Sequence, residues 1–255
     1  MTTPQPDPPV IDLATPDGAR YVLLHDDYFV RQKFAGPLEQ QIAEMAAVLA
    51  ACFKRLPSIV NAARELRTAR TDLLKGFVVG VLDDLVVSVK LLLAGKAAAS
   101  GNVARQAIEG LAMALLCSTD HELVILERPK QGDLRGRYWQ MAMVPDERLI
   151  EGQRAVQQLG WNAETLRLPK DWITWLAAAQ KRYSAVSHAG GLTIALRTNL
   201  NGAAAISFGG HFDPEKLDWY RVEMTHRILL GRELAEVIEY LVHTMAPRPA
   251  ASTKG

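Results

Sequence analysis

The sequence predicts a mainly α fold, a multi-helix bundle of roughly six or seven helices with one small β-hairpin near residues 192–208. Apolar residues recur at intervals of three and four over residues 37–118 and again over 214–244, which places them on one face of a helix. Between these regions, residues 192–208 contain two short apolar runs on either side of Asn201-Gly202, a dipeptide typical of hairpin turns. The bundle and the hairpin together define the predicted fold class.

The domain organisation follows from composition. Residues 1–20 are rich in Pro, Asp and Thr, which predicts a flexible N-terminal tail. Residues 21–246 are predicted to form a single helical domain, and residues 247–255 a second flexible tail. At the start of the domain, residues 21–30 fit either a short strand or the beginning of a helix, and the sequence leaves both open.

The first helices are predicted from an amphipathic stripe that begins after Pro37. Pro57 lies within this pattern and is expected to kink or restart the helix. The apolar pattern continues to Ala94-Gly95, and a second apolar helix rich in Ala and Gly covers residues 96–118. Small side chains let a neighbouring helix approach closely, so these two segments are predicted to form a helical hairpin at the centre of the bundle.

The second half contains further predicted helices. Residues 129–136 are expected to form a loop, and residues 137–143 and 146–159 to form helices. Pro169 favours the start of the next helix, and Gly190-Gly191 favours a stop. The apolar spacing of that helix comes from Trp172, Leu176, Ala179 and Tyr183. Asp213-Pro214 is a strong start signal for a long last helix that reaches about Thr244.

Charge and cysteine usage exclude several classes of protein. The 29 basic and 28 acidic residues give a formal net charge of +1, so no global field attracts nucleic acid. Local basic clusters are expected to be solvated helix faces or loops (Arg64, Arg67 and Arg70; Arg128, Lys130, Arg135 and Arg137). Cys52 and Cys117 lie in apolar helical runs and are predicted to be buried, reduced thiols, which favours a cytoplasmic protein.

No membrane segment or cleaved signal is predicted. Prolines at positions 4, 6, 8 and 9 preclude an apolar helical signal sequence. The most hydrophobic window, residues 73–93, contains Asp83 and Asp84, which would be costly in lipid. This window is therefore predicted to be a core helix.

Two polar pairs lie on apolar helices. Arg105 and Glu109 are four residues apart, which puts them on one face. They are predicted either to form an intrahelical ion pair or to support a buried polar network near His188. Glu223 and His226 have the spacing of half a di-iron motif, but the helical runs hold no second copy. No metal or cofactor is therefore expected.

Arg182 and His188 are the candidate catalytic residues. A guanidinium binds phosphate through two hydrogen bonds, and an imidazole near its own pKa takes a proton from a 2′-hydroxyl or gives one to a leaving oxygen. Six residues apart on a continuous helix, the two side chains would point roughly 120° apart. They converge on one phosphate only if the helix ends between them. The alternative is that His188 caps or packs the helix end.

This Arg-x5-His element, late in a helical bundle, resembles the motif of the HEPN family (higher eukaryote and prokaryote nucleotide-binding domains). The resemblance implies that two copies meet across a homodimer as a metal-independent ribonuclease site, often in toxins or phage-defence proteins. It would assign phosphate binding to Arg182 and general acid–base chemistry to His188. The family often has a small polar residue after the Arg, where this chain has Tyr183.

A looser likeness concerns the order of the elements. Bacterial helical proteins with an Arg-x3-Glu helix and a later Ser-x-x-His segment are similar in layout to residues 105–109 and 184–188 here, which implies a fold rather than an activity. Two functional classes follow. One is a HEPN-like ribonuclease acting on RNA as a homodimer, with an antitoxin or other protein partner. The other is a non-enzymatic helical binding or scaffold module.

Overall fold

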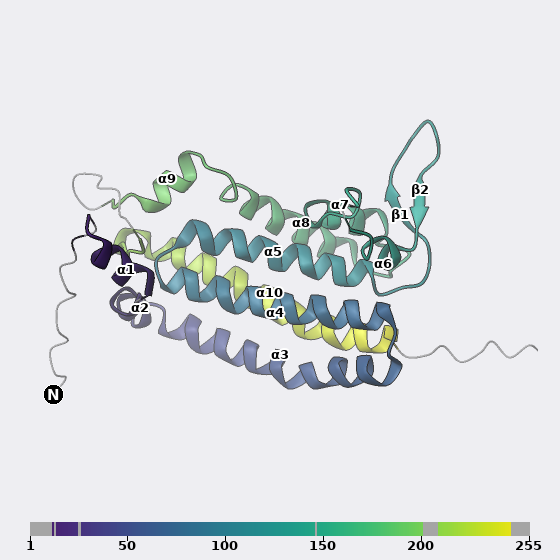
Figure 1. The fold of residues 1–255 in the computed structure, drawn as a ribbon, viewed down its shortest axis with the longest axis horizontal. Helices are drawn as coiled ribbons and strands as arrows, with labels where there is room; N and C mark the ends of the chain where they lie inside the picture. The colour runs from purple at the N-terminus through teal and green to yellow at the C-terminus, as the bar shows by residue number, and fades with distance from the viewer. Residues whose placement is uncertain (1–11, 13, 25–26, 146, 201–208, 246–255) are drawn as a thin grey trace, which may run out of the picture.

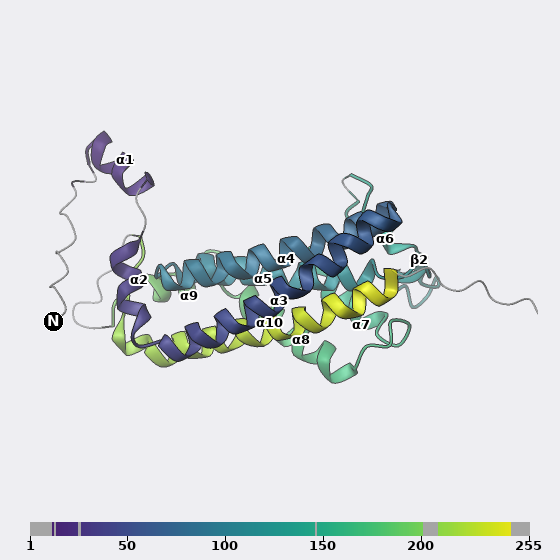
Figure 2. The ribbon, with the colours of Figure 1, turned by 90° about the horizontal axis from the view of Figure 1, so that it is seen from below.

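The computed structural model describes residues 12, 14–24, 27–145, 147–200 and 209–245, and these form a mainly helical bundle (Figure 1). Four long helices run side by side along the long axis of the molecule in both views (Figures 1 and 2). They are α3 (Glu39–Leu66), α4 (Ala69–Leu93), α5 (Ala97–Leu116) and α10 (Leu217–Met245). The predicted mainly α fold class is confirmed.

Shorter elements cover the side and the two ends of this bundle (Figure 1). Packed along α5 are α7 (Gly152–Trp161) and α8 (Lys170–Ser184). At one end lie α1 (Pro16–Leu24), α2 (Tyr28–Ala35) and α9 (Gly191–Arg197). At the other end lie β1 (Leu123–Leu126), β2 (Leu134–Gly136) and α6 (Tyr138–Met141). A 3-10 turn, η1 (Pro214–Lys216), leads directly into α10.

The predicted position of the hairpin is wrong. Residues 191–197 form α9, and the second apolar run, at 203–208, lies outside the described residues. The hairpin found in the described chain is instead the antiparallel pair β1–β2, in which Leu123 faces Gly136. Part of this pair falls in residues 129–136, which were expected to form a loop. Helix α9 starts at Gly191, where the hydroxyl of Thr193 bonds the backbone of Gly190 and closes the first turn.

Several helix boundaries also differ from the expectation. Helix α1 starts at Pro16, so residues 16–20 belong to a helix rather than to the predicted tail. Residues 21–24 are helical, which resolves the ambiguity at that point. Helix α7 begins at Gly152 rather than at residue 146. Helix α3 continues through Pro57 and does not restart there. Pro57 lies on the exposed side of the helix, so water can bond the backbone carbonyl that loses its partner because proline has no N–H.

The core is the apolar interior between the four long helices, as the spacing predicts. Cys52 and Cys117 are both fully buried free thiols. The apolar window at residues 73–93 lies within α4, and its helical hairpin with α5 is confirmed. Within the part of the chain that is described, no helix is both long and apolar enough to cross a membrane.

The connection between α4 and α5 depends on Gly95. Its φ of +71° lies in the left-handed region, and a Cβ there would collide with the backbone of His211. A side chain at position 95 would therefore meet both backbone strain and a steric clash. The close approach brings the segment that precedes α10 against the α4–α5 turn.

Candidate functional site

The candidate site begins with Arg182, in the last turn of α8. Its Nε and Nη2 donate to Oε1 of Glu223 on α10, at 2.9 and 2.6 Å. The Arg182 side chain is 36% exposed, whereas that of Glu223 is only 5% exposed. The ion pair therefore joins two helices and fixes a guanidinium whose Nη1 is not used by Glu223.

Glu223 is shared with a second arginine, Arg227, one turn further along α10. The Nη1 of Arg227 donates to Oε2 of Glu223 at 2.8 Å, and the Arg227 side chain is 1% exposed. Its Nε donates to Ser88 Oγ at 2.8 Å and its Nη2 to Ser100 Oγ at 2.7 Å. All three nitrogens of the buried guanidinium thus have partners, as a buried charge requires.

Tyr183 completes this cluster from α8. Its hydroxyl accepts a hydrogen bond from Arg227 Nη1 at 3.2 Å, and its ring lies 5.4 Å from the Arg227 guanidinium carbon. Burial raises the pKa of Tyr183 to about 12, although nearby Arg227 acts in the opposite direction. The phenol therefore stays neutral and acts as a hydrogen-bonding group rather than as a base.

The cluster holds two guanidinium groups for one carboxylate. Burial acts to raise the pKa of Glu223, but the charge and hydrogen bonds of Arg227 and Arg182 outweigh it and lower that pKa. Glu223 is consequently ionised at neutral pH. One positive charge is left over, which favours an anion at the exposed edge of the cluster, where Arg182 meets solvent.

His226 lies beside this cluster on α10. Its Nδ1 is buried and has no hydrogen-bond partner among the described residues. Burial lowers the pKa of His226, and Arg182 lowers it further, while Glu223 acts in the opposite direction. The imidazole is therefore neutral at pH 7, which rules out a further positive charge next to the two guanidinium groups.

His188 lies just beyond the end of α8, in a bend that precedes α9, and it is exposed. Val186 anchors this turn on α5, because a Cβ at Gly101 would lie only 2.5 Å from Val186 Cγ2. The helix thus ends between Arg182 and His188, as convergence of the two side chains requires. In the described part of the chain, no hydrogen bond joins them, and His188 is not buried as a packed cap would be.

The predicted supporting pair forms a separate contact. Arg105 Nε donates to Glu109 Oε1 at 2.7 Å, which is the intrahelical ion pair expected from the spacing. Gln180 of α8 also donates to Glu109 Oε1, at 3.0 Å. The pair therefore helps to hold α8 against α5, two residues before Arg182, but it is not part of the Arg227 cluster.

Sequence reasoning missed the residues that hold Arg182. Glu223 was considered only with His226 as half of an iron motif, and no group of three or more metal-binding side chains occurs among the described residues. The available signal was the i, i+4 spacing of Glu223 and Arg227 on an apolar helix. Ser88 and Ser100, each 0% exposed within apolar helices, were a second signal.

Comparison with models of known protein families, with curated proteins and with solved structures finds no match to this chain. The site is therefore interpreted from its own geometry.

Proposed function

We propose that Arg182 and His188 form half of a metal-independent endoribonuclease site of the HEPN type, completed by a second copy of the chain. The observation that carries the proposal is the setting of Arg182. Glu223 holds this guanidinium in place through two hydrogen bonds, while Nη1 remains for a phosphate at the exposed edge. A preorganised cation needs no reorientation as charge develops on the phosphate.

The proposed chemistry uses only protein groups. The 2′-hydroxyl of the RNA attacks the neighbouring phosphorus, the bond from phosphorus to the 5′-oxygen breaks, and a 2′,3′-cyclic phosphate and a 5′-hydroxyl result. His188 takes the proton of the 2′-hydroxyl or supplies one to the leaving oxygen. Arg182 neutralises the charge on the phosphate oxygens. A homodimer supplies two histidines, so that one acts as base and the other as acid.

The biological role that follows from this activity is a toxin or phage-defence effector in the cytoplasm. The test is growth after induced expression of the wild type, Arg182→Ala and His188→Ala, with total RNA inspected for fragments. Lys181→Ala is the matched control, because Lys181 is an exposed cation beside Arg182. We expect toxicity and RNA cleavage for the wild type and the control, and neither for the two site variants.

Purified protein removes the effect of an antitoxin on this test. Cleavage of single-stranded RNA should persist in excess chelator and should disappear in both site variants. Mixing Arg182→Ala with His188→Ala should restore part of the activity if the site is shared across a dimer. A monomeric mass in solution, or intact RNA with the purified wild type, would reject the ribonuclease proposal.

A non-enzymatic binding or scaffold module is the second candidate function. The observation that favours it is the exposure of two large apolar side chains of α9, Leu192 and Ile194, which are 45% and 56% exposed. In this alternative, the pairing of Arg182 with Glu223 only secures α8 to α10. Loss of a co-purifying partner in Ile194→Asp, with equal growth and intact RNA in all site variants, would favour the binding module over the enzyme.

A further inference from the structure

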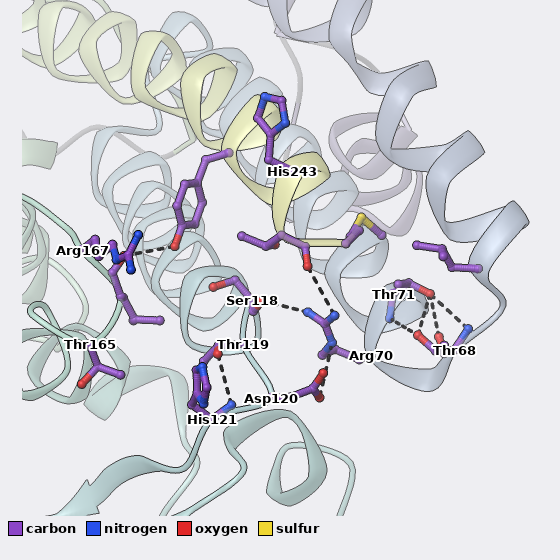
Figure 3. Close-up of a pocket in the computed structure, with 15 residues that line it drawn as sticks. Thr68, Arg70, Thr71, Ser118, Thr119, Asp120, His121, Thr165, Arg167 and His243 are labelled. Atoms are coloured by element: carbon purple, nitrogen blue, oxygen red, sulfur yellow. Dashed lines mark hydrogen bonds and ion pairs between the residues drawn. The ribbon is translucent and has the colours of Figure 1, made fainter. Parts of the chain in front are cut away.

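A second polar site lies at the end of the bundle opposite α9. There the start of α4, the residues after α5, the residues after α7 and the last turn of α10 enclose a cavity of about 840 Å³ (Figure 3). This volume falls within the range of roughly 300–1,000 Å³ of small-molecule sites. Such sites are mostly apolar, whereas this one is lined by many hydroxyl groups, two arginines and two histidines.

Arg70 forms one wall of the cavity. Its Nη1 donates to the carbonyl of Ser118 at 2.8 Å and its Nη2 to that of Thr244 at 3.4 Å, while its Nε lies 3.7 Å from Asp120. Arg70 thus donates hydrogen bonds to carbonyls near the ends of α5 and α10 and pairs with Asp120, the one carboxylate that lines the cavity. It is not the solvated arginine expected from the sequence.

Arg167 forms the opposite wall and is differently placed. Its side chain is exposed and makes no hydrogen bond or ion pair with any residue that the structure describes. Figure 3 shows it on the same side of the cavity as Thr165, across from Arg70, with Thr119 between them next to Ser118. With Arg70 and Asp120 balanced, the Arg167 charge remains without a counter-ion.

The backbone of Arg167 is unusual as well. Its φ is +56°, at the position after a helical turn where glycine is the usual residue. The bonds Leu168 N–H to Ala163 O (2.8 Å) and Arg167 N–H to Glu164 O (3.1 Å) are the pair that defines this type of helix end. Local stability therefore favours glycine at position 167, and an arginine there points to a use for its side chain.

Two hydroxyl groups that line the cavity are also available as donors. Thr119 Oγ1 accepts the backbone N–H of His121 at 3.1 Å, which leaves its own proton to donate. The Thr165 hydroxyl makes no hydrogen bond within the described ranges. The hydroxyls of Thr119 and Thr165 can thus each donate a hydrogen bond to a ligand in the cavity that Arg167 also lines. Their complement is a ligand group that only accepts hydrogen bonds and carries negative charge.

We propose that this cavity binds a small phosphate ester, such as a sugar phosphate or a nucleoside monophosphate, with the phosphate at Arg167, Thr165 and Thr119. Phosphate offers several acceptor oxygens to a guanidinium, and Arg is suited to bind it through two hydrogen bonds. The remaining volume, bordered by Leu66, Leu166 and Met245, accommodates the body of the ester. This site is independent of the proposed ribonuclease site.

The test is calorimetric titration of the full chain with inorganic phosphate, ribose 5-phosphate, adenosine 5′-monophosphate and unphosphorylated ribose. We expect at least one of the two esters to bind and ribose not to bind. Tighter binding of the nucleotide would indicate that its base lies against Leu66, Leu166 and Met245. Tighter binding of ribose 5-phosphate would indicate that the site is selective for a sugar phosphate. Failure of both esters to bind the wild type, or binding of inorganic phosphate alone, would overturn the proposal.

Substitutions of Arg167 test whether the ester binds at this residue. Arg167→Gly and Arg167→Gln should each weaken ester binding by roughly tenfold or more, since each removes a charged hydrogen-bond donor. The matched control is Arg67→Gly, because Arg67 also has a left-handed backbone (φ +52°) at a helix end but does not line the cavity. Unchanged affinity in both Arg167 variants would also overturn the proposal. Arg167→Gly should fold at least as stably as the wild type, so lost binding cannot be attributed to unfolding.

Discussion

Two arginines, Arg227 inside the bundle and Arg167 at its end, differ in how fully their side-chain donors are used. Arg227 gives all three nitrogens to Glu223, Tyr183, Ser88 and Ser100, and no part of it is left for a ligand. Arg167 gives its side chain to no residue in the described part of the chain. A fully used buried guanidinium indicates a structural role, and an unused one over a cavity indicates binding. Arg182 lies between these extremes.

The comparison is tested most strongly at Arg227. Arg227→Met leaves Glu223 buried with Arg182 alone, and the hydroxyls of Ser88 and Ser100 without their donor. We expect the free energy of unfolding to fall by about 3–5 kcal/mol, as for removal of one partner of a buried ion pair. Urea unfolding measures it. The exposed Arg221→Met on the same helix should change it by less than about 0.5 kcal/mol. A loss below about 1 kcal/mol for Arg227→Met contradicts the structural role.

Substitution of Arg182 should have an intermediate effect on the free energy of unfolding. Arg182→Gln removes a charged donor from Glu223, but the Arg182 side chain is partly exposed and Arg227 still neutralises the carboxylate. We expect a loss of about 1–2 kcal/mol in the free energy of unfolding. The same urea experiment measures it, with Lys181→Gln as the control. A stability equal to that of the wild type would contradict a stabilising role for the pairing of Arg182 with Glu223.

Substitution of Arg167 should increase the stability of the protein, whereas substitution of Arg227 or Arg182 should decrease it. Arg167→Gly relieves a left-handed backbone at a position that favours glycine, so we expect stability to rise by about 1 kcal/mol. Thermal unfolding detects the change as a higher Tm. A lower Tm would mean that Arg167 makes a stabilising contact and would weaken the contrast with Arg227.

The smallest expected effect is a pH dependence at His226. Burial, Arg182 and Arg227 lower its pKa in the folded state, so between that pKa and the unfolded value near 6.5 the unfolded chain binds more protons. Stability should therefore fall as the pH drops below about 6.5. In His226→Gln this decline should be shallower, but not absent, because burial and Lys216 also lower the pKa of His211.

The wild type is the reference for the pH experiment. Stability measured by urea unfolding from pH 7.5 to pH 5.5 gives the slopes. Equal slopes for the wild type and His226→Gln would show that the folded-state pKa of His226 is not lowered.

The fold was largely predictable because its signals are local. The side chain of Asp213 accepts the backbone N–H of Glu215 at the turn that leads into α10, as the Asp-Pro pair indicates. The apolar spacing likewise located α4 and α5. The error at residues 191–197 arose because LTIALRT is short enough to suit either a strand or two turns of helix.

The candidate site was only partly predictable because its contacts are long-range. Arg182 was identified by its spacing to His188, yet its observed partner, Glu223, is 41 residues away. The partners of Arg227 on α4 and α5 are 139 and 127 residues away. Spacing along one helix reports neighbours on that helix, and it carries no information on which polar residue of a distant helix faces them.

The two serines beneath Arg227 make the α4–α5 hairpin self-sufficient in hydrogen bonds at this point. Ser88 Oγ donates to the carbonyl of Ser100 at 2.9 Å, and Ser100 Oγ donates to that of Ser88 at 2.7 Å. These bonds need only α4, α5 and the short turn at Gly95, which are close in sequence and entropically inexpensive to bring together. Both hydroxyls therefore need no group of α10 to accept their protons, and their lone pairs remain as acceptors for Arg227.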